Sequence, residues 1–91
     1  MPVSKEEAVE KARKDLSHRL GVADNQITEQ SVEDADFPDM ALGAAPTGEM
    51  SGQMMTPGWR IRLQANGKTF EYRANKQQLR LFNFNGQNFK I

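Results

Sequence analysis

An asparagine–glycine pair at residues 66 and 67 lies between two alternating stretches, and this pattern constrains the fold more than any other feature. Asn-Gly is the preferred two-residue loop of a β-hairpin. Such a loop fixes the register, so Leu63 should face Phe70 and Ile61 should face Tyr72. One side of the predicted hairpin is therefore apolar; it carries Trp59, Ile61, Leu63, Ala65, Phe70, Tyr72 and Ala74.

The other side of this hairpin is charged. Arg62 should face Glu71, which makes a favourable ion pair across the strands. Arg60 should face Arg73, which is unfavourable unless an anion lies nearby.

A helix is predicted before the hairpin, beginning at the N-cap Ser4 and ending at Gly21. Ser4 and Glu7 have the spacing of a capping box, and glycine is the usual residue after the last turn of a helix. The predicted apolar stripe consists of Val9, Ala12, Leu16 and Leu20. We expect this stripe to cover the apolar face of the hairpin.

The remaining elements have weaker patterns. Residues 27–32 and 79–84 are predicted as strands, and Asn85-Gly86 predicts a second tight turn, into a short strand 88–91, that sets Phe82 opposite Phe89. Asp36 is expected to cap a single helical turn, and residues 56–59 (Thr-Pro-Gly-Trp) a type II turn. The predicted fold is α+β in a single domain, residues 1–91: one N-terminal helix packed on an antiparallel sheet of three to five strands, a β-meander.

Composition narrows the class of protein. Hydrophobic residues are 37% and charged residues 26%, which is too apolar and too neutral for a disordered chain. The absence of cysteine excludes disulfides, thiolate zinc sites and thiol nucleophiles. No apolar run reaches transmembrane length. We expect a soluble monomer, cytoplasmic if the chain is complete as written and exported if a signal was removed.

The long loop predicted at residues 37–58 is the first candidate for a function, because loops of this length in small domains are usually functional or disordered. It is rich in methionine and contains no lysine or arginine. Exposed methionines make adaptable contact surfaces. The leading hypothesis is a non-catalytic protein-binding module, inhibitor-like in character, that presents Phe37, Met50, Met54, Met55 and Trp59 to another protein.

No catalytic constellation is recognisable, so neither an enzyme nor a cofactor is predicted. His18, the single histidine, lies near the end of the helix, where it suits the helix dipole. One alternative is a small ligand- or cation-binding protein that uses the acidic turn 33–39, although the spacing is not that of an EF-hand. The acidic side chains of that turn are Glu33, Asp34, Asp36 and Asp39.

A further alternative is nucleic-acid binding through the basic strands 59–80. Residues 1–56 carry eleven acids and five bases, whereas residues 57–91 carry one acid and seven bases. Single-strand binders place aromatic and basic side chains on the same face of a sheet. Alternation here sets the hairpin's rings opposite to its arginines, which favours packing of the two halves against each other.

An ordered series of short motifs covers about two-thirds of the chain. It runs from Asp15-Leu16 and Arg19-Leu20-Gly21-Val22 through Ile27, Phe37-Pro38-Asp39 and Leu42-Gly43 to Thr56-Pro57-Gly58-Trp59-Arg60-Ile61 and Tyr72-Arg73, within residues 12–74. The series resembles a group of small uncharacterised bacterial domains, frequent in cyanobacteria, with the pattern D-L-x-x-R-L-G-V, W-P-D-x-x-L-G and T-P-G-Y-x-I-x-L. Here Phe37 replaces the tryptophan, Ala44 a cysteine and Trp59 the tyrosine. The helix-then-meander layout is also similar to cystatin-like inhibitor folds, an analogy of fold alone.

Overall fold

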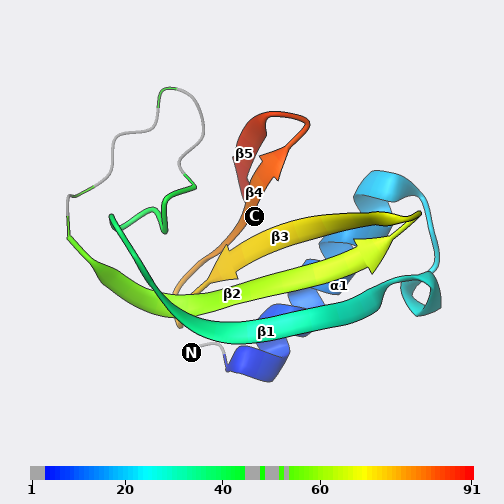
Figure 1. The fold of residues 1–91 in the computed structure, drawn as a ribbon, viewed down its shortest axis with the longest axis horizontal. Helices are drawn as coiled ribbons and strands as arrows, with labels where there is room; N and C mark the ends of the chain where they lie inside the picture. The colour runs from blue at the N-terminus through cyan, green and yellow to red at the C-terminus, as the bar shows by residue number, and fades with distance from the viewer. Residues whose placement is uncertain (1–3, 45–47, 49–51, 53) are drawn as a thin grey trace.

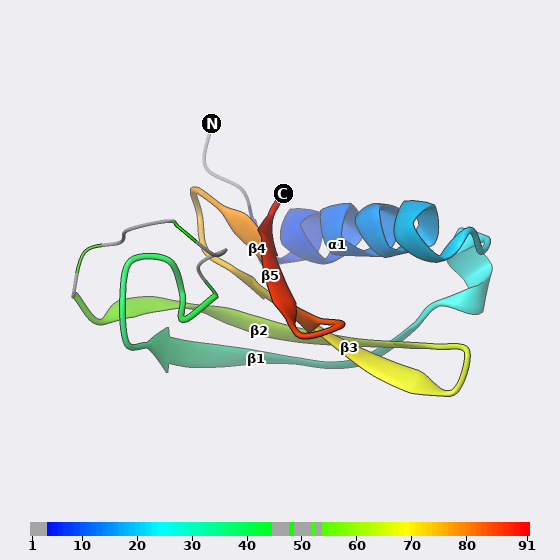
Figure 2. The same cartoon turned by 90° about the horizontal axis from the view of Figure 1, so that it is seen from above.

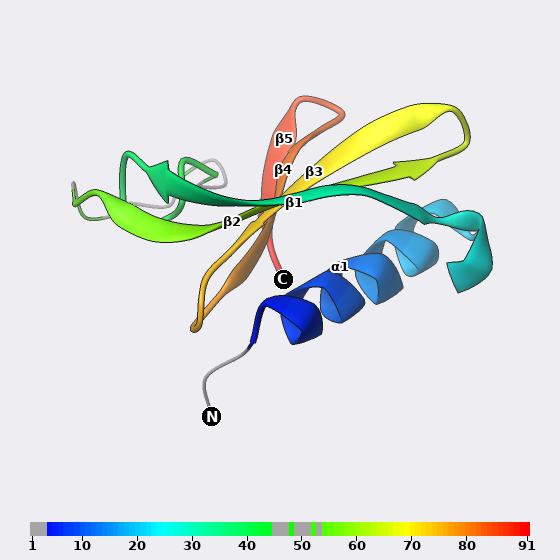
Figure 3. The same cartoon turned by 60° about the horizontal axis from the view of Figure 1, so that its bottom comes forward.

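The computed structural model describes residues 4–44, 48, 52 and 54–91 of the chain. A single antiparallel sheet in the order β1-β2-β3-β4-β5 has a helix against one face (Figures 1 and 3). This arrangement confirms the predicted α+β meander. The elements are α1 (Lys5–Leu20), a 3-10 turn η1 (Asp24–Gln26), β1 (Thr28–Phe37), β2 (Thr56–Ala65), β3 (Lys68–Ala74), β4 (Leu79–Phe84) and β5 (Gln87–Lys90).

Helix α1 has the predicted ends, and three residues of the predicted stripe, Val9, Ala12 and Leu16, are buried, whereas Leu20 is only partly buried. The Ser4 hydroxyl accepts a hydrogen bond from the Glu7 N–H at 3.2 Å. Gly21 has a left-handed φ of 68° and donates its N–H to the Ser17 carbonyl, which closes the last turn. The buried residues of α1 are Ala8, Val9, Ala12 and Leu16.

The central hairpin sets the core. Ile61 faces Tyr72 and Leu63 faces Phe70, in the predicted register. The side chains of Ile61, Leu63 and Tyr72 are fully buried against α1, together with Leu81 of β4. Below, the face of the sheet that carries these residues is called the helix side, and the opposite face the outer side.

A buried polar contact joins the helix to the sheet. The Tyr72 hydroxyl donates to Asp15 Oδ2 at 2.7 Å, and Arg19 Nε donates to the same oxygen at 2.7 Å. Tyr72 is fully buried. Burial, followed by the hydrogen bond to the Asp15 carboxylate, raises the pKa of Tyr72 well above its ordinary value.

The predicted pairing of Phe82 with Phe89 is wrong, because β4 contains a bulge. Asn83 adopts a left-handed φ of 54°, and its N–H donates to Asn88 Oδ1 at 2.8 Å. The extra residue shifts the register so that Leu81 faces Phe89. Phe82 instead lies opposite Glu71, on the outer side.

The segment between β1 and β2 is shorter than predicted, because both strands are longer. β1 continues to Phe37, and β2 begins at Thr56. No type II turn forms at residues 56–59, since Pro57 pairs with Asp36 and Gly58 with Ala35 inside the sheet. A Cβ atom on Gly58 would overlap the Ala74 carbonyl oxygen and crowd the ring of Phe37, so this strand position requires glycine.

Residues 38–44 fold onto the outer side, where Phe37, Ala41, Leu42 and Ala44 are buried. Asp36 lies in β1 and caps no helical turn. No helix forms in residues 38–44, and Asp39 stabilises the turns there, because its Oδ1 accepts the N–H groups of Ala41 and Gly43 at 2.9 and 3.0 Å.

Arg73 holds this segment in place. Its Nη1 donates to the carbonyls of Leu42 and Gly43 at 3.0 and 3.3 Å. Its guanidinium lies 3.7 Å from the centre of the Phe82 ring and 5.2 Å from that of Phe37. Below, this set of contacts is called the Arg73 clamp.

The predicted pairing of Arg60 with Arg73 across the two strands is confirmed. Glu71 is the anion that offsets the repulsion between the two guanidinium groups. Arg60 and Arg73 each place Nε near Glu71 Oε2, at 3.5 and 2.8 Å, while Arg62 Nε lies 3.6 Å from Oε1. One carboxylate therefore offsets the repulsion within a group of three arginines.

High pH should destabilise the protein through Tyr72. The folded-state pKa of Tyr72 is raised, so the buried phenol contributes stability that is fully present below the unfolded pKa of about 10. Above that pH the free energy of unfolding should fall with each unit, by at most about 1.4 kcal/mol for one proton. Urea unfolding of the wild type and Tyr72→Phe across this pH range measures the difference. Equal slopes in the two proteins would contradict the expectation.

Arg73→Lys should release residues 38–44, because an ammonium cannot serve two carbonyls and a carboxylate while stacking on a ring. We expect a loss of about 2 kcal/mol in unfolding free energy. Amide exchange should accelerate at Leu42 and Ala44 while Ile61 stays protected. Arg62→Lys is the matched control on the same face and should cost less than about 0.5 kcal/mol. An equal cost for both variants would show that the clamp contributes nothing.

Candidate functional site

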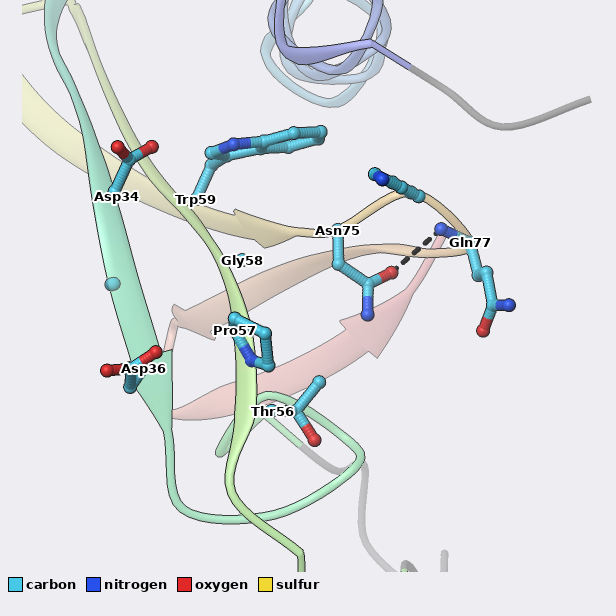
Figure 4. A pocket seen from close by; sticks show the side chains of 10 residues that line it. Asp34, Asp36, Thr56, Pro57, Gly58, Trp59, Asn75 and Gln77 are labelled. Atoms are coloured by element: carbon cyan, nitrogen blue, oxygen red, sulfur yellow. Dashed lines mark hydrogen bonds between the residues drawn. The ribbon is translucent and has the colours of Figure 1, made fainter.

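An open hollow of about 610 Å³ lies at one end of the sheet, on its helix side (Figure 4). Residues of β1 form one wall, the turn between β3 and β4 forms the opposite wall, and β2 lies between them. The residues that line it are Asp34, Ala35, Asp36, Thr56, Pro57, Gly58, Trp59, Asn75, Lys76 and Gln77.

The hollow exists because β1 and β2 continue past the first turn of α1 (Figure 2). Lys5, the first residue of α1, places Nζ 3.0 Å from Asp34 Oδ1 at the rim. Beyond this ion pair the sheet continues, and Asp34, Asp36, Pro57 and Trp59 share the helix side by strand alternation. No helix covers this part of the described sheet.

The walls of the hollow differ in chemistry. Half-buried Trp59 packs against the core and offers an aromatic surface, next to exposed Pro57. Asp36 adds a carboxylate on the β1 wall, and Lys76 an ammonium on the turn. Asn75 Oδ1 accepts the N–H groups of Gln77 and Gln78 at 2.8 and 3.0 Å, which fixes the turn. Such a mixed, open hollow suits binding of an amphipathic group.

The five predicted binding residues are not brought together. Phe37 is only 1% exposed and belongs to the Arg73 clamp, so the expectation that it faces a partner is wrong for this structure. Met54 and Met55 are exposed, at 63% and 69%. Trp59 lines the hollow, and Met50 lies outside the described residues.

The four acids of the predicted acidic turn do not converge either, because they lie on a strand whose side chains alternate. Glu33 points to the outer side, where Arg62 Nη1 is 3.6 Å away, and Asp34 pairs with Lys5. Asp39 is occupied by backbone N–H groups. The described part of the chain contains no group of three or more acidic, histidine or cysteine side chains that could hold a metal.

The rings and the arginines of the hairpin lie on opposite faces, as alternation predicts. Arg60, Arg73 and Arg80 stand in register across three strands. They do not form an open basic surface, since Arg73 is covered by residues 38–44 and Arg80 is only 5% exposed. Phe82 shares their face, but Arg73 stacks on its ring.

Sequence reasoning missed the hollow, and it did not include Met40 among the predicted binding residues, although Met40 is half exposed. The hollow depends on where α1 begins relative to the ends of β1 and β2, which local patterns do not specify. A signal for it was present in the sequence, because Asp34 and Asp36 are spaced like alternate residues of a strand, as are Pro57 and Trp59.

Comparison with known proteins identifies a family and no function. No curated protein and no solved structure matches this chain. Among the described residues no helix is long and apolar enough to cross a membrane. A family model described as a domain of unknown function, DUF8738, matches residues 9–82, from within α1 to within β4. The chain therefore belongs to the DUF8738 family, a family of uncharacterised domains.

Proposed function

We propose that this protein is a non-catalytic protein-binding module, and one observation carries the proposal. In the described part of the chain, the exposed large hydrophobic side chains are three methionines of the β1–β2 connection and Ile91. Met40, Met54 and Met55 are exposed at 50%, 63% and 69%, and they are called the methionine surface below. Methionine is flexible and polarisable, which suits an adaptable contact with another protein.

Hydrogen bonds hold the backbone of Met40, one of the three residues of the methionine surface. The Met40 N–H donates to the Gly52 carbonyl at 2.9 Å, which draws the two ends of the connection together. Gln78 Nε2 donates to the Met40 carbonyl at 2.7 Å, and the Arg73 clamp holds the neighbouring residues. A residue whose backbone is ordered before binding loses less conformational entropy when a partner binds.

The non-catalytic part of the proposal is supported by the positions of the polar groups. His18 is exposed near the C-terminal end of α1, whereas the hollow lies beyond the N-terminal end of α1. Catalysis by a nucleophile and a base needs both side chains within hydrogen-bond reach. The groups around the hollow are carboxylates, amides, a threonine and a lysine, which suit recognition of a partner.

The double variant Met54→Ser/Met55→Ser tests the proposal. Both side chains are exposed, so the unfolding free energy should change by less than about 0.5 kcal/mol. Capture of the partner from a lysate of the source organism should fall about tenfold or more, as expected when an interface loses apolar anchors.

Gln64→Ser/Gln87→Ser is the matched control, because it changes two exposed residues outside the connection. It should capture the partner as the wild type does. A photo-crosslinking residue at position 55 should become joined to that partner. Equal capture by the methionine variant and the control would refute the proposal.

A further inference from the structure

Strand β1 is an outermost strand of the sheet and pairs with β2 alone. Over the residues that the structure describes, no backbone hydrogen bond joins Thr28–Phe37 to any segment other than β2. One side of β1 therefore presents its N–H and C=O groups without backbone partners, most regularly over residues 31–37, because the pairing with β2 is irregular between Glu29 and Ser31. An edge of this kind is a template for the addition of another strand.

On the helix side, β1 forms part of the wall of two hollows. The larger one includes Asp34 and Asp36, as described above. The smaller one, of about 200 Å³, lies between α1 and β1 and is lined by Lys5, Glu6, Val9, Glu29 and Val32. Alternate side chains of an added strand share one face. Those on the helix side would therefore stand next to the β1 residues that line the hollows, Asp34 and Asp36 in the larger one and Glu29 and Val32 in the smaller one.

The negative charge of the β1 edge favours a positively charged binding partner. Residues 20–59 contain seven acids and no lysine or arginine, and four of these acids are in β1. Glu33 and Asp34 pair with Arg62 and Lys5. Glu29 and Asp36 form no ion pair with any described residue. The free edge is thus anionic and complements a cationic segment.

We propose that a basic, extended segment of a partner protein adds to β1 as a further strand and places a lysine or arginine side chain in the larger hollow. This inference rests on the proposed function and specifies its binding mode. The main-chain ladder supplies affinity, and the hollow supplies specificity. The cation lies against the Trp59 ring and next to the Asp36 carboxylate. Lys76 on the opposite wall keeps it on the β1 side.

A second copy of this chain is a poorer occupant of the same edge. Pairing β1 with β1 would set four acids against four, and like charges across strands are destabilising. Charged side chains on edge strands commonly prevent this kind of self-association. The same acids that oppose a second copy attract a basic strand.

The test uses capped synthetic heptapeptides and isotope-labelled protein. A peptide of alternating lysine and threonine should shift the amide resonances of Thr28–Phe37 and the indole resonance of Trp59. A peptide with glutamate in place of lysine should not. A lysine–threonine peptide that is N-methylated at alternate residues keeps its charge but cannot complete the ladder, so its affinity should fall about tenfold or more.

Asp36→Lys should weaken binding of the lysine–threonine peptide by about tenfold, whereas Glu10→Lys, an equal charge change on the exposed side of α1, should have little effect. Equal binding of the methylated peptide, or shifts confined to other strands, would overturn strand addition. So would the absence of shifts in β1 at the highest soluble peptide concentration. A dimer of the unliganded protein in sedimentation, with these same β1 resonances broadened, would assign the edge to a second copy and overturn it too.

The two proposals fail separately. If Asp36→Lys captures the partner as well as the wild type while Met54→Ser/Met55→Ser does not, strand addition is wrong and the methionine surface stands. If the methionine variant captures normally, the methionine surface fails, and the peptide titration alone decides whether β1 accepts a strand.

Discussion

The alternation of the β2–β3 hairpin determines the two sides of this molecule. The Asn66-Gly67 turn pairs Ile61 with Tyr72, and both side chains point to α1, where the Tyr72 hydroxyl meets Asp15. The same alternation sends Arg60 and Arg73 to the outer side. Arg73 then donates hydrogen bonds to the carbonyls of Leu42 and Gly43. Through these bonds the β2–β3 hairpin holds residues 38–44 of the β1–β2 connection against the sheet. A shift of one residue would exchange the two faces and remove the helix contact and the clamp together.

Elements with local signals could be predicted from the sequence, and elements set by distant partners could not. The caps at Ser4 and Gly21 and the Asn-Gly register rest on neighbouring residues. Pro57-Gly58 favours a turn by itself, but pairing with β1 overrides this preference. The ladder between β2 and β3 ends where Trp59 faces Ala74, the last residue of β3. Pro57 lies beyond this end, so its missing N–H group removes no hydrogen bond to β3. Counting residues outward from the Asn85-Gly86 turn could not predict the bulge at Asn83, because the extra residue lies inside the strand.

The candidate site was predicted only in part, for a related reason. Met54 and Met55 follow from composition, since exposed methionines in a long connection need no partner inside the chain. Phe37 was misassigned because its burial depends on Arg73 and Gly58, which are distant in sequence. The acids at residues 33–39 were interpreted as one cluster, but a strand sends Glu33 and Asp34 to opposite faces. The hollow itself forms because β1 and β2 extend further than α1, and no local sequence pattern specifies this difference.

The segregation of charge along the chain is only partly neutralised by folding. On the outer side Glu71 and Glu33 lie among Arg60, Arg62 and Arg73, so acidic and basic halves do meet there. At the β1 edge, by contrast, Lys5 is the described base that pairs with a β1 acid on the helix side. Like charges along an exposed edge repel each other, and this repulsion is relieved when a cation binds. The packing of the two halves therefore does not explain why the β1 edge is anionic next to a hollow that contains Trp59. A basic strand paired with β1 would complete both the backbone ladder and the charge balance.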